Sequence, residues 1–191
     1  MKKWKNWRSR GRKAADFTGG TLKIFYAHKR DIFPLLCRAV LYGGHAEVFK
    51  RIPHTGALID CARNAVPNMD FLRRFIALLA LMGFDRLQLY VEDCMQVMDE
   101  PYFGYMRGRF TYETLREIDA YCADFGIELV PCVQTLAHLQ RLFMHWHVYT
   151  DRIRDKDDVL LVGEDRTYGL IENVIKTCAA CFTSRRINIG M

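Results

Sequence analysis

Residues 56–83 have the sequence GALIDCARNAVPNMDFLRRFIALLALMG, a short apolar run followed by a helical pattern. The run Ala57–Cys61 has the length and composition of a buried strand, with Asp60 near its carboxyl end. The pair Pro67–Asn68 is typical of a helix start, and Gly83 is typical of a helix end. Between these signals the apolar residues recur at helical spacing: Phe71, Leu72, Phe75, Ile76, Leu78, Leu79 and Met82. The stretch therefore predicts one strand followed by one helix.

The same strand-and-helix unit recurs along the rest of the chain. Strands are predicted at Arg86–Val91, Ile127–Val133 and Ile187–Met191. A helix capped by Thr111 carries the apolar stripe Leu115, Ile118, Tyr121, Cys122 and Phe125. A later helix, Tyr168–Phe182, is expected to turn six apolar residues inward: Leu170, Ile171, Val174, Ile175, Cys178 and Phe182. This alternation predicts a parallel α/β sheet, and four such strands fit either half of a barrel or a small open sheet.

A shorter pattern precedes this regular part. Thr21–Tyr26 is predicted as a strand and Asp31–Tyr42 as a helix that ends at Gly43 and Gly44. We expect residues 14–50 to be the remnant of a preceding α/β domain.

The positive charge of the chain is confined to its start. The formal net charge is +6, but seven basic residues lie in a stretch without a carboxylate: Lys2, Lys3, Lys5, Arg8, Arg10, Arg12 and Lys13. The rest of the chain carries 21 basic and 22 acidic residues and is nearly neutral. We therefore expect residues 1–13 to be a solvated basic tail. No helix carries clustered Lys or Arg with interleaved aromatic residues, so no nucleic-acid partner is expected.

The chain shows no targeting or membrane segment, and a cytoplasmic location is expected. Ala14–Thr21 is too polar and Gly-rich for the apolar part of a signal peptide, and no apolar run reaches membrane-spanning length. The seven cysteines are odd in number and mostly lie in apolar segments, which favours reduced, buried thiols. Cys178 and Cys181 form a C-x-x-C pair, but no second pair completes four zinc ligands. No metal or cofactor is expected, and the histidines 138, 145 and 147 lack a suitably placed carboxylate.

Polar residues follow each predicted strand, where the catalytic groups of parallel α/β folds gather. Asp60 and Arg63 follow the first of these strands, Glu92 and Asp93 the second, and His138 the third, together with Gln134. These residues also have a structural interpretation. Asp60 and Arg63 would form an ion pair, Glu92 and Asp93 would lie in a solvated loop, and His138 would be a helix residue bound to a backbone carbonyl. Their convergence at one rim favours a functional site.

Four segments in order resemble glycoside hydrolase family 20, the β-N-acetylhexosaminidases. Gly56–Asn64 is similar to the first barrel strand of that family and Leu87–Asp93 to the second. Pro131–His138 resembles the third-strand motif, and Arg186–Met191 resembles the start of the fourth. The resemblance implies that residues 51–191 form an incomplete TIM-type (β/α)8 barrel, comprising about the first four β/α units.

The resemblance also implies roles for individual residues. Arg63 would hold hydroxyls of the terminal sugar, and Asp93 and His138 would be further substrate-binding residues. Asp60 and Glu92 would support them. The implied activity is the removal of terminal N-acetylhexosamine from N-acetylhexosamine-containing glycans, by a retaining mechanism in which the substrate's own acetamido oxygen attacks the anomeric carbon.

The family's catalytic Asp-Glu pair is expected to follow Met191. By resemblance, the Asp would orient the acetamido group and the Glu would protonate the leaving oxygen. Glu92 and Asp93 are poor substitutes, because neighbouring strand residues point to opposite faces. We therefore expect the 191-residue chain alone to be inactive. Because an apolar parallel strand seldom closes a domain, we also expect the protein to continue beyond Met191.

The chain departs from the family's pattern at several positions, which suggests a divergent branch. Tyr90 replaces a frequent His, Cys132 and Gln134 replace common carboxylates, and Leu136–Ala137 replaces Pro-Gly. Residues 100–109 resemble a loop of that branch, and their aromatic rings are expected either to stack on sugars or to pack internally.

A second function class stays open. The chain is also compatible with a non-catalytic sugar-binding or assembly module, a half barrel that pairs with a second copy or with a separately encoded second half.

Overall fold

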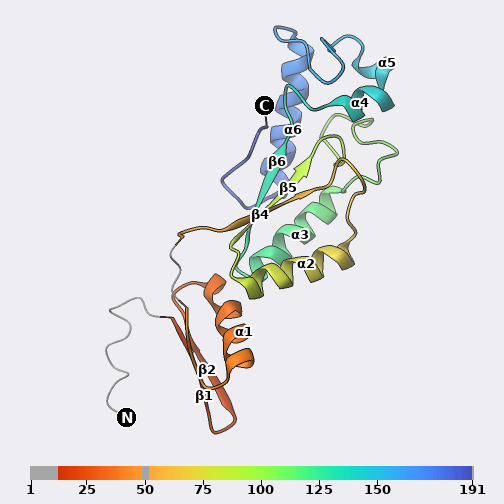
Figure 1. Ribbon diagram of the computed structural model, residues 1–191. Helices are drawn as coiled ribbons and strands as arrows, with labels where there is room; N and C mark the ends of the chain where they lie inside the picture. The colour runs from red at the N-terminus through yellow and green to blue at the C-terminus, as the bar shows by residue number, and fades with distance from the viewer. Residues whose placement is uncertain (1–12, 49–51, 191) are drawn as a thin grey trace.

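The structure, a computed structural model, describes residues 13–48 and 52–190 (Figure 1). The predicted basic tail lies outside the described residues except for Lys13. The Nζ atom of Lys13 lies 2.5 Å from Oδ1 of the buried Asp31, so this residue is part of the fold.

The first part of the chain is a small antiparallel sheet covered by one helix. Its strands β1 (Ala14–Thr18), β2 (Thr21–Phe25) and β3 (His45–Glu47) lie in the order β2-β1-β3. A 3-10 turn at Lys29–Asp31 leads into helix α1 (Ile32–Tyr42), which packs on the sheet. The predicted strand at 21–26 and helix at 31–42 are thus confirmed to within one residue, whereas β1 and β3 were not predicted. Their core is small and rich in alanine: Ala15, Leu35, Ala39 and Ala46.

The second part is a parallel sheet formed by three of the four predicted strands. Strands β4 (Gly56–Asp60), β5 (Arg86–Val91) and β6 (Glu128–Val133) lie in the order β4-β5-β6. Both pairings are parallel, and Asp60, Tyr90 and Cys132 occupy one row across the sheet. The carboxyl ends of the three strands therefore meet at one edge.

Three long helices connect and cover these strands, namely α2 (Met69–Met82), α3 (Tyr112–Asp124) and α6 (Asp165–Cys181). Helix α3 packs between α2 and α6, and Figure 1 shows α2 and α3 side by side along one flank of the sheet. Asn68 caps α2 by accepting a hydrogen bond from the Phe71 amide, and Thr111 caps α3 in the same way from Thr114. Two short helices, α4 (Gln140–His145) and α5 (His147–Thr150), lie in the connection from β6 to α6.

The main core lies between the sheet and these helices, and it uses the whole predicted stripe of α3 but only part of those of α2 and α6. Residues 72, 76 and 79 of α2 are buried, but Phe71, Leu78 and Met82 expose 49%, 56% and 64% of their surface. The predicted stripe was wider than the face that α2 buries, which consists of Leu72, Ile76, Leu79 and Ala80. Ile175 of α6 is likewise 41% exposed.

Two further predictions were wrong in detail. Leu58 in β4 is 53% exposed, because it points to the face of the sheet opposite the main core, whereas Ala57 and Ile59 pack against that core. The predicted strand at 187–191 forms only a single bridge, in which Asn188 pairs with Cys132 of β6. The Asn188 amide donates to the Pro131 carbonyl, and the Val133 amide donates to the Asn188 carbonyl. The segment therefore follows β6 without forming a regular strand, and Met191 lies outside the described residues.

All seven cysteines are free thiols, and six of them are buried. Burial first, and then the neighbouring Cys181, raises the pKa of Cys178 to about 12, so the C-x-x-C pair consists of protonated, packed thiols in α6. Within residues 13–48 and 52–190, no helix is both long and apolar enough to cross a bilayer.

Candidate functional site

The candidate site lies at the carboxyl edge of the parallel sheet. Asp60 is the last residue of β4, and Tyr90 lies beside it in β5. The loop after β4 carries Arg63, and Glu92 follows the end of β5. The predicted rim residues Asp60, Arg63 and Glu92 are therefore brought together by the parallel register of the two strands.

Arg63 is at the centre of this cluster. Its Nη1 donates to Oδ2 of Asp60 at 2.6 Å, and its Nη2 donates to the Tyr90 hydroxyl at 3.2 Å. The same Nη2 lies 3.8 Å from Oε1 of Glu92, and the guanidinium carbon lies 4.7 Å from the centroid of the Tyr90 ring. The side chain is nevertheless 56% exposed, so the guanidinium is oriented by its neighbours while facing solvent.

Asp60 and Glu92 are kept in different protonation environments. Burial raises the pKa of Asp60, but hydrogen bonds from the Arg63 side chain and from the Ala62 and Arg63 amides outweigh it and lower the pKa overall. Burial also raises the pKa of Glu92, and the Tyr90 hydrogen bond and the Arg63 charge offset it only in part. Asp60 is thus the firmly ionised partner of Arg63, and Glu92 is the carboxyl that takes up a proton more readily.

Asp93 faces a different partner from Glu92. Its side chain is fully buried, and its Oδ1 accepts a hydrogen bond from Nε of Arg107 at 3.0 Å. The same guanidinium donates through Nη2 to the backbone carbonyl of Ala62, next to Arg63. The expectation that the two neighbouring carboxylates aim in different directions is consistent with these partners. The second oxygen of Asp93 is buried and has no hydrogen-bond partner among the described residues.

The loop between β5 and α3 passes directly over Asp93. Gly104 in this loop has a φ of +68°, and a Cβ atom built on it would lie 2.2 Å from the Asp93 carbonyl oxygen. Only glycine fits this close approach. The loop therefore brings Arg107 against Asp93 and closes one side of the rim.

His138 lies apart from the cluster. It is exposed, precedes α4 rather than lying in a helix, and has a φ of +61°. No hydrogen bond joins it to Arg63, Glu92 or Asp93 among the described residues. A left-handed backbone is uncommon at residues other than glycine, and Asp99 and Met106 share it with His138.

Two residues of the site were not identified from the sequence as site residues. Tyr90 was noted only as a departure from the family's pattern, although its row in the sheet places it beside Asp60. Arg107 lies 14 residues beyond Asp93 in a loop, and no spacing rule links the two. The sequence contained a signal for Tyr90 in the strand register and none for Arg107.

The aromatic residues of the loop between β5 and α3 differ in their burial. Phe103 is 1% exposed and belongs to the core. Tyr102 and Tyr105 expose 51% and 48% of their surface. The loop therefore packs through one ring and presents two others to solvent.

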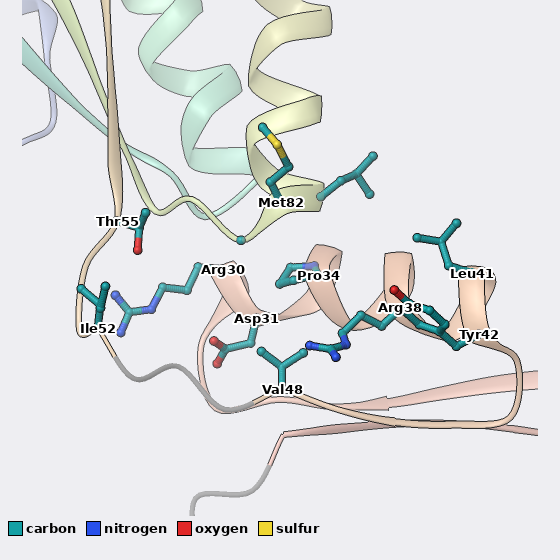
Figure 2. Close-up of a pocket in the computed structure, with 12 residues that line it drawn as sticks. Arg30, Asp31, Pro34, Arg38, Leu41, Tyr42, Val48, Ile52, Thr55 and Met82 are labelled. Carbon is teal, nitrogen blue, oxygen red and sulfur yellow. The ribbon is translucent and has the colours of Figure 1, made fainter.

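A separate cavity of about 610 Å³ lies between α1 and the end of α2 (Figure 2). Figure 2 shows Arg30 and Asp31 on its floor, but these charges are compensated, since Arg30 pairs with Asp85 and Asp31 with Lys13. Thr55 and Gly83, which line it, precede β4 and β5. The cavity thus lies at the amino end of the sheet, opposite the rim.

Comparison with known proteins identifies relatives in sequence. No protein-family model matches the chain. A β-hexosaminidase from Akkermansia muciniphila is 31% identical over 111 residues, which cover 48% of this chain and 22% of that protein. A β-hexosaminidase from Vibrio furnissii is 26% identical over 73% of this chain and 28% of its own length. The chain thus spans about a quarter of the length of the curated relatives it matches.

Comparison of structures finds the same fold in solved family 20 enzymes. The family 20 exo-β-N-acetylglucosaminidase from Vibrio harveyi, solved with N-acetylglucosamine, matches 95% of this chain and 36% of its own, with a TM-score of 0.76 at 18% identity. The family 20 β-N-acetylhexosaminidase from Streptomyces coelicolor matches 92% of this chain and 44% of its own, with a TM-score of 0.73 at 20% identity. The resemblance predicted from the four strand motifs is confirmed: the chain is similar in sequence to β-hexosaminidases and has the α/β fold of part of a glycoside hydrolase family 20 β-N-acetylhexosaminidase.

Proposed function

We propose that this chain supplies the terminal-sugar-binding rim of a family 20 β-N-acetylhexosaminidase, whose substrates are N-acetylhexosamine-containing glycans. In this proposal residues 51–191 are about the first four β/α units of a (β/α)8 barrel, and residues 14–50 are the remnant of a preceding α/β domain. The parallel order β4-β5-β6 and the separate core of the first sheet support this division.

The observation that carries the proposal is the orientation of Arg63. A guanidinium has five N–H donors, and two of them take part in the hydrogen bonds to Asp60 and Tyr90. The exposed remainder is suited to donate to the vicinal hydroxyls of a terminal sugar. Because Asp60 and Glu92 hold the guanidinium in place, little side-chain entropy is lost when the sugar binds.

Asp93 and His138 complete the proposed binding rim. The Asp93 carboxylate is fully buried beneath Arg107, so it acts on the sugar by holding Arg107 and, through Arg107, the loop that carries Arg63. His138 supplies an exposed imidazole from the neighbouring strand end. Donors and acceptors from three strand ends would then surround one sugar ring.

In the proposed mechanism the chain's own residues bind and orient the sugar. The acetamido oxygen of the substrate attacks the anomeric carbon, and the configuration is retained. By resemblance, a catalytic Asp-Glu pair would orient the acetamido group and protonate the leaving oxygen, and the four strand motifs of residues 56–191 do not contain that pair. The 191-residue chain itself would then bind the sugar without cleaving it.

Calorimetric titration of the 191-residue protein with N-acetylglucosamine tests the proposed binding. We expect saturable binding that Arg63→Ala weakens at least tenfold, because the donors to the sugar are removed. Arg38→Ala is the matched control, since Arg38 is an exposed arginine of α1. Equal affinities for the Arg63 and Arg38 variants would contradict the proposal.

Hydrolysis of an aryl N-acetylglucosaminide tests whether the 191-residue chain binds the sugar without cleaving it. We expect the pure 191-residue protein to show no turnover above that of its Arg63→Ala variant. Turnover that depends on Arg63 would show that this chain contains its own catalytic acid.

A second candidate function is an assembly module that pairs with a second half barrel. It is favoured by the apolar residues that α2 exposes, Phe71, Leu78 and Met82, and by the outer edge of β4. Size-exclusion chromatography with light scattering distinguishes the two, since a module should form a defined oligomer that Leu78→Lys dissociates.

We also propose a cytoplasmic location, supported by the seven free thiols. Imaging of a fluorescent fusion tests it, and an extracytoplasmic signal would overturn it.

A further inference from the structure

The cavity at the amino end of the parallel sheet takes no part in the proposed sugar site. It lies between α1 and the end of α2 (Figure 2), and its volume of about 610 Å³ is within the range of small-molecule pockets. None of the proposed sugar-binding residues lines it. Its apolar wall comes from both parts of the chain and consists of Pro34, Leu41, Val48, Ile52, Leu81 and Met82.

The cavity is held open by contacts between α1 and the amino end of the parallel sheet. Nη1 of Arg30 donates to Oδ2 of the buried Asp85 at 2.6 Å. The rings of Phe33 in α1 and Phe125 at the end of α3 lie 4.6 Å apart, centroid to centroid. A Cβ atom on Gly126 would lie 2.5 Å from the Arg30 amide nitrogen, so these two backbones are in close contact. The cavity is therefore formed before any ligand binds.

The charged residues around the cavity leave one cation without a partner. Arg30 is paired with Asp85, and Oδ1 of Asp31 accepts a hydrogen bond from Nζ of Lys13 at 2.5 Å. Arg38 is exposed and forms no hydrogen bond or ion pair with any residue of 13–48 or 52–190. The cavity thus combines an apolar wall with a single uncompensated positive charge.

The Arg38 side chain is directed along the apolar wall. Figure 2 shows it extending from α1 toward Val48. A guanidinium binds a carboxylate through two parallel N–H···O hydrogen bonds, which fix the orientation of the ligand. An apolar group on the same ligand would remove the wall from water, which is favourable. A second negative charge would be unfavourable, because the carboxylate of Asp31 also lines the cavity.

We propose that this cavity binds an amphipathic monoanion, a carboxylate attached to an alkyl or aryl group. The carboxylate accepts hydrogen bonds from Arg38, and the apolar group packs against Leu41, Val48 and Met82. Binding is non-covalent. It does not depend on the proposed function, because the cavity and the sugar-binding rim lie at opposite ends of the sheet.

Titration of the isotopically labelled 191-residue protein with octanoate tests the proposal. We expect saturable chemical-shift changes at the amides of residues 35–42 and 81–83, with one molecule bound per chain. Octanol has the same alkyl chain without the charge, and acetate has the charge without the chain, so each should bind at least about tenfold more weakly. Inorganic phosphate, a dianion without an apolar group, should not displace octanoate.

Substitution of Arg38 tests the contribution of the charge. Arg38→Gln should lower the affinity for octanoate about tenfold, to that of octanol, and leave the affinity for octanol unchanged. Arg74→Gln is the matched control, because Arg74 is an exposed arginine of α2 that does not line the cavity. It should change neither affinity.

Two neighbouring residues of α1 test the contribution of the apolar wall. Leu41 and Val40 expose 69% and 73% of their surface, but only Leu41 lines the cavity. Leu41→Ser should weaken the binding of octanoate and octanol alike, because it removes apolar contact area. Val40→Ser should change neither. All four substituted residues are exposed, so the variants should fold, and circular dichroism checks this.

Four outcomes would overturn the proposal. Equal affinities for octanoate and octanol would show that the cavity does not select an anion. Octanoate binding that Arg38→Gln and Leu41→Ser leave unchanged, or octanoate shifts at residues 60–63, would place the ligand elsewhere. Displacement of octanoate by phosphate would show a simple anion site. The absence of saturable binding would show that the cavity takes no such ligand.

Discussion

Arg107 compensates the charge of Asp93, whose side chain is fully buried. Removing the guanidinium in Arg107→Met leaves a buried carboxylate without its cation, so the free energy of unfolding should fall by about 3–5 kcal/mol. Urea denaturation at pH 7 measures this loss. Arg109→Met is the control. Within residues 13–48 and 52–190, Arg109 donates only to the backbone carbonyls of Pro101 and Phe103, so this variant should lose less stability.

A second variant separates charge from packing at this position. Asp93→Asn in the Arg107→Met background removes the uncompensated charge and should recover part of the lost stability. An equally unstable double variant would show that Arg107 acts through packing alone.

The two carboxyls around Arg63, Asp60 and Glu92, should contribute to the stability of the fold with opposite pH dependences. The native pKa of Glu92 is raised by burial, so its contribution to stability is complete below about pH 4.3, the unfolded value, and is lost as the pH rises through the native pKa. The native pKa of Asp60 is lowered despite burial, so its contribution is present above about pH 3.9 and is lost as the pH falls through the native pKa. Urea denaturation of the native protein, of Glu92→Gln and of Asp60→Asn between pH 3 and 8 measures both contributions to the free energy of unfolding. Contributions that change with pH in the same direction would contradict the opposite pKa shifts.

At the scale of elements, the loop between β5 and α3 offers a matched pair of glycines. Gly104 and Gly108 both have positive φ, of +68° and +63°, but only a Cβ on Gly104 would meet the Asp93 carbonyl, whereas one on Gly108 meets nothing within 4 Å. Gly108→Ala should cost about 1–2 kcal/mol of stability from backbone strain. Gly104→Ala adds a steric clash and should cost clearly more in thermal or urea unfolding. Equal costs would show that the loop does not pass against Asp93.

Elements with a strong periodic pattern were predicted well. Helix α2 was predicted from Asn68 and Gly83, and both residues cap it in the structure. The strand at 86–91 has the predicted bounds. Strands β1 and β3 were missed because β1 begins with two alanines, β3 has three residues, and neither carries the alternation of large apolar residues from which strands are predicted.

Edges of the sheet were the least predictable part of the fold. An apolar run does not reveal whether both faces of its strand are covered, so the exposure of Leu58, on the face of β4 opposite the main core, could not be predicted. The segment at 187–190 illustrates the same limit, since its apolar residues follow β6 but form only one bridge. Burial on both faces is a property of the assembled sheet rather than of the local sequence.

At the scale of the whole molecule, the two sheets have cores of very different size. The core of the first sheet consists of Leu35 and three alanines, whereas the main core contains thirty buried residues. Because little apolar area is buried around β1 and β2, their amides should open at a lower free energy than those of β5. Native-state hydrogen exchange measures this difference, and equal protection would show that the two sheets unfold as one unit.

The candidate site was predicted in part because it depends on topology. Parallel strands bring their carboxyl ends together, so the proximity of Asp60, Arg63 and Glu92 follows once the strands are recognised. The partner of Asp93 could not be predicted, since Arg107 reaches it through a loop whose path depends on Gly104. Loop conformation, unlike strand order, is not encoded in a periodic pattern.

The proposed function requires the carboxyl edge of the parallel sheet to bind a terminal N-acetylhexosamine. The most direct test is to titrate the isotopically labelled 191-residue protein with N-acetylglucosamine and to follow the chemical shifts of its backbone amides. We predict saturable shifts at residues 60–63, 92–93 and 138 that Arg63→Ala abolishes. Shifts confined to the cavity between α1 and α2, or no saturable shift, would contradict the claim.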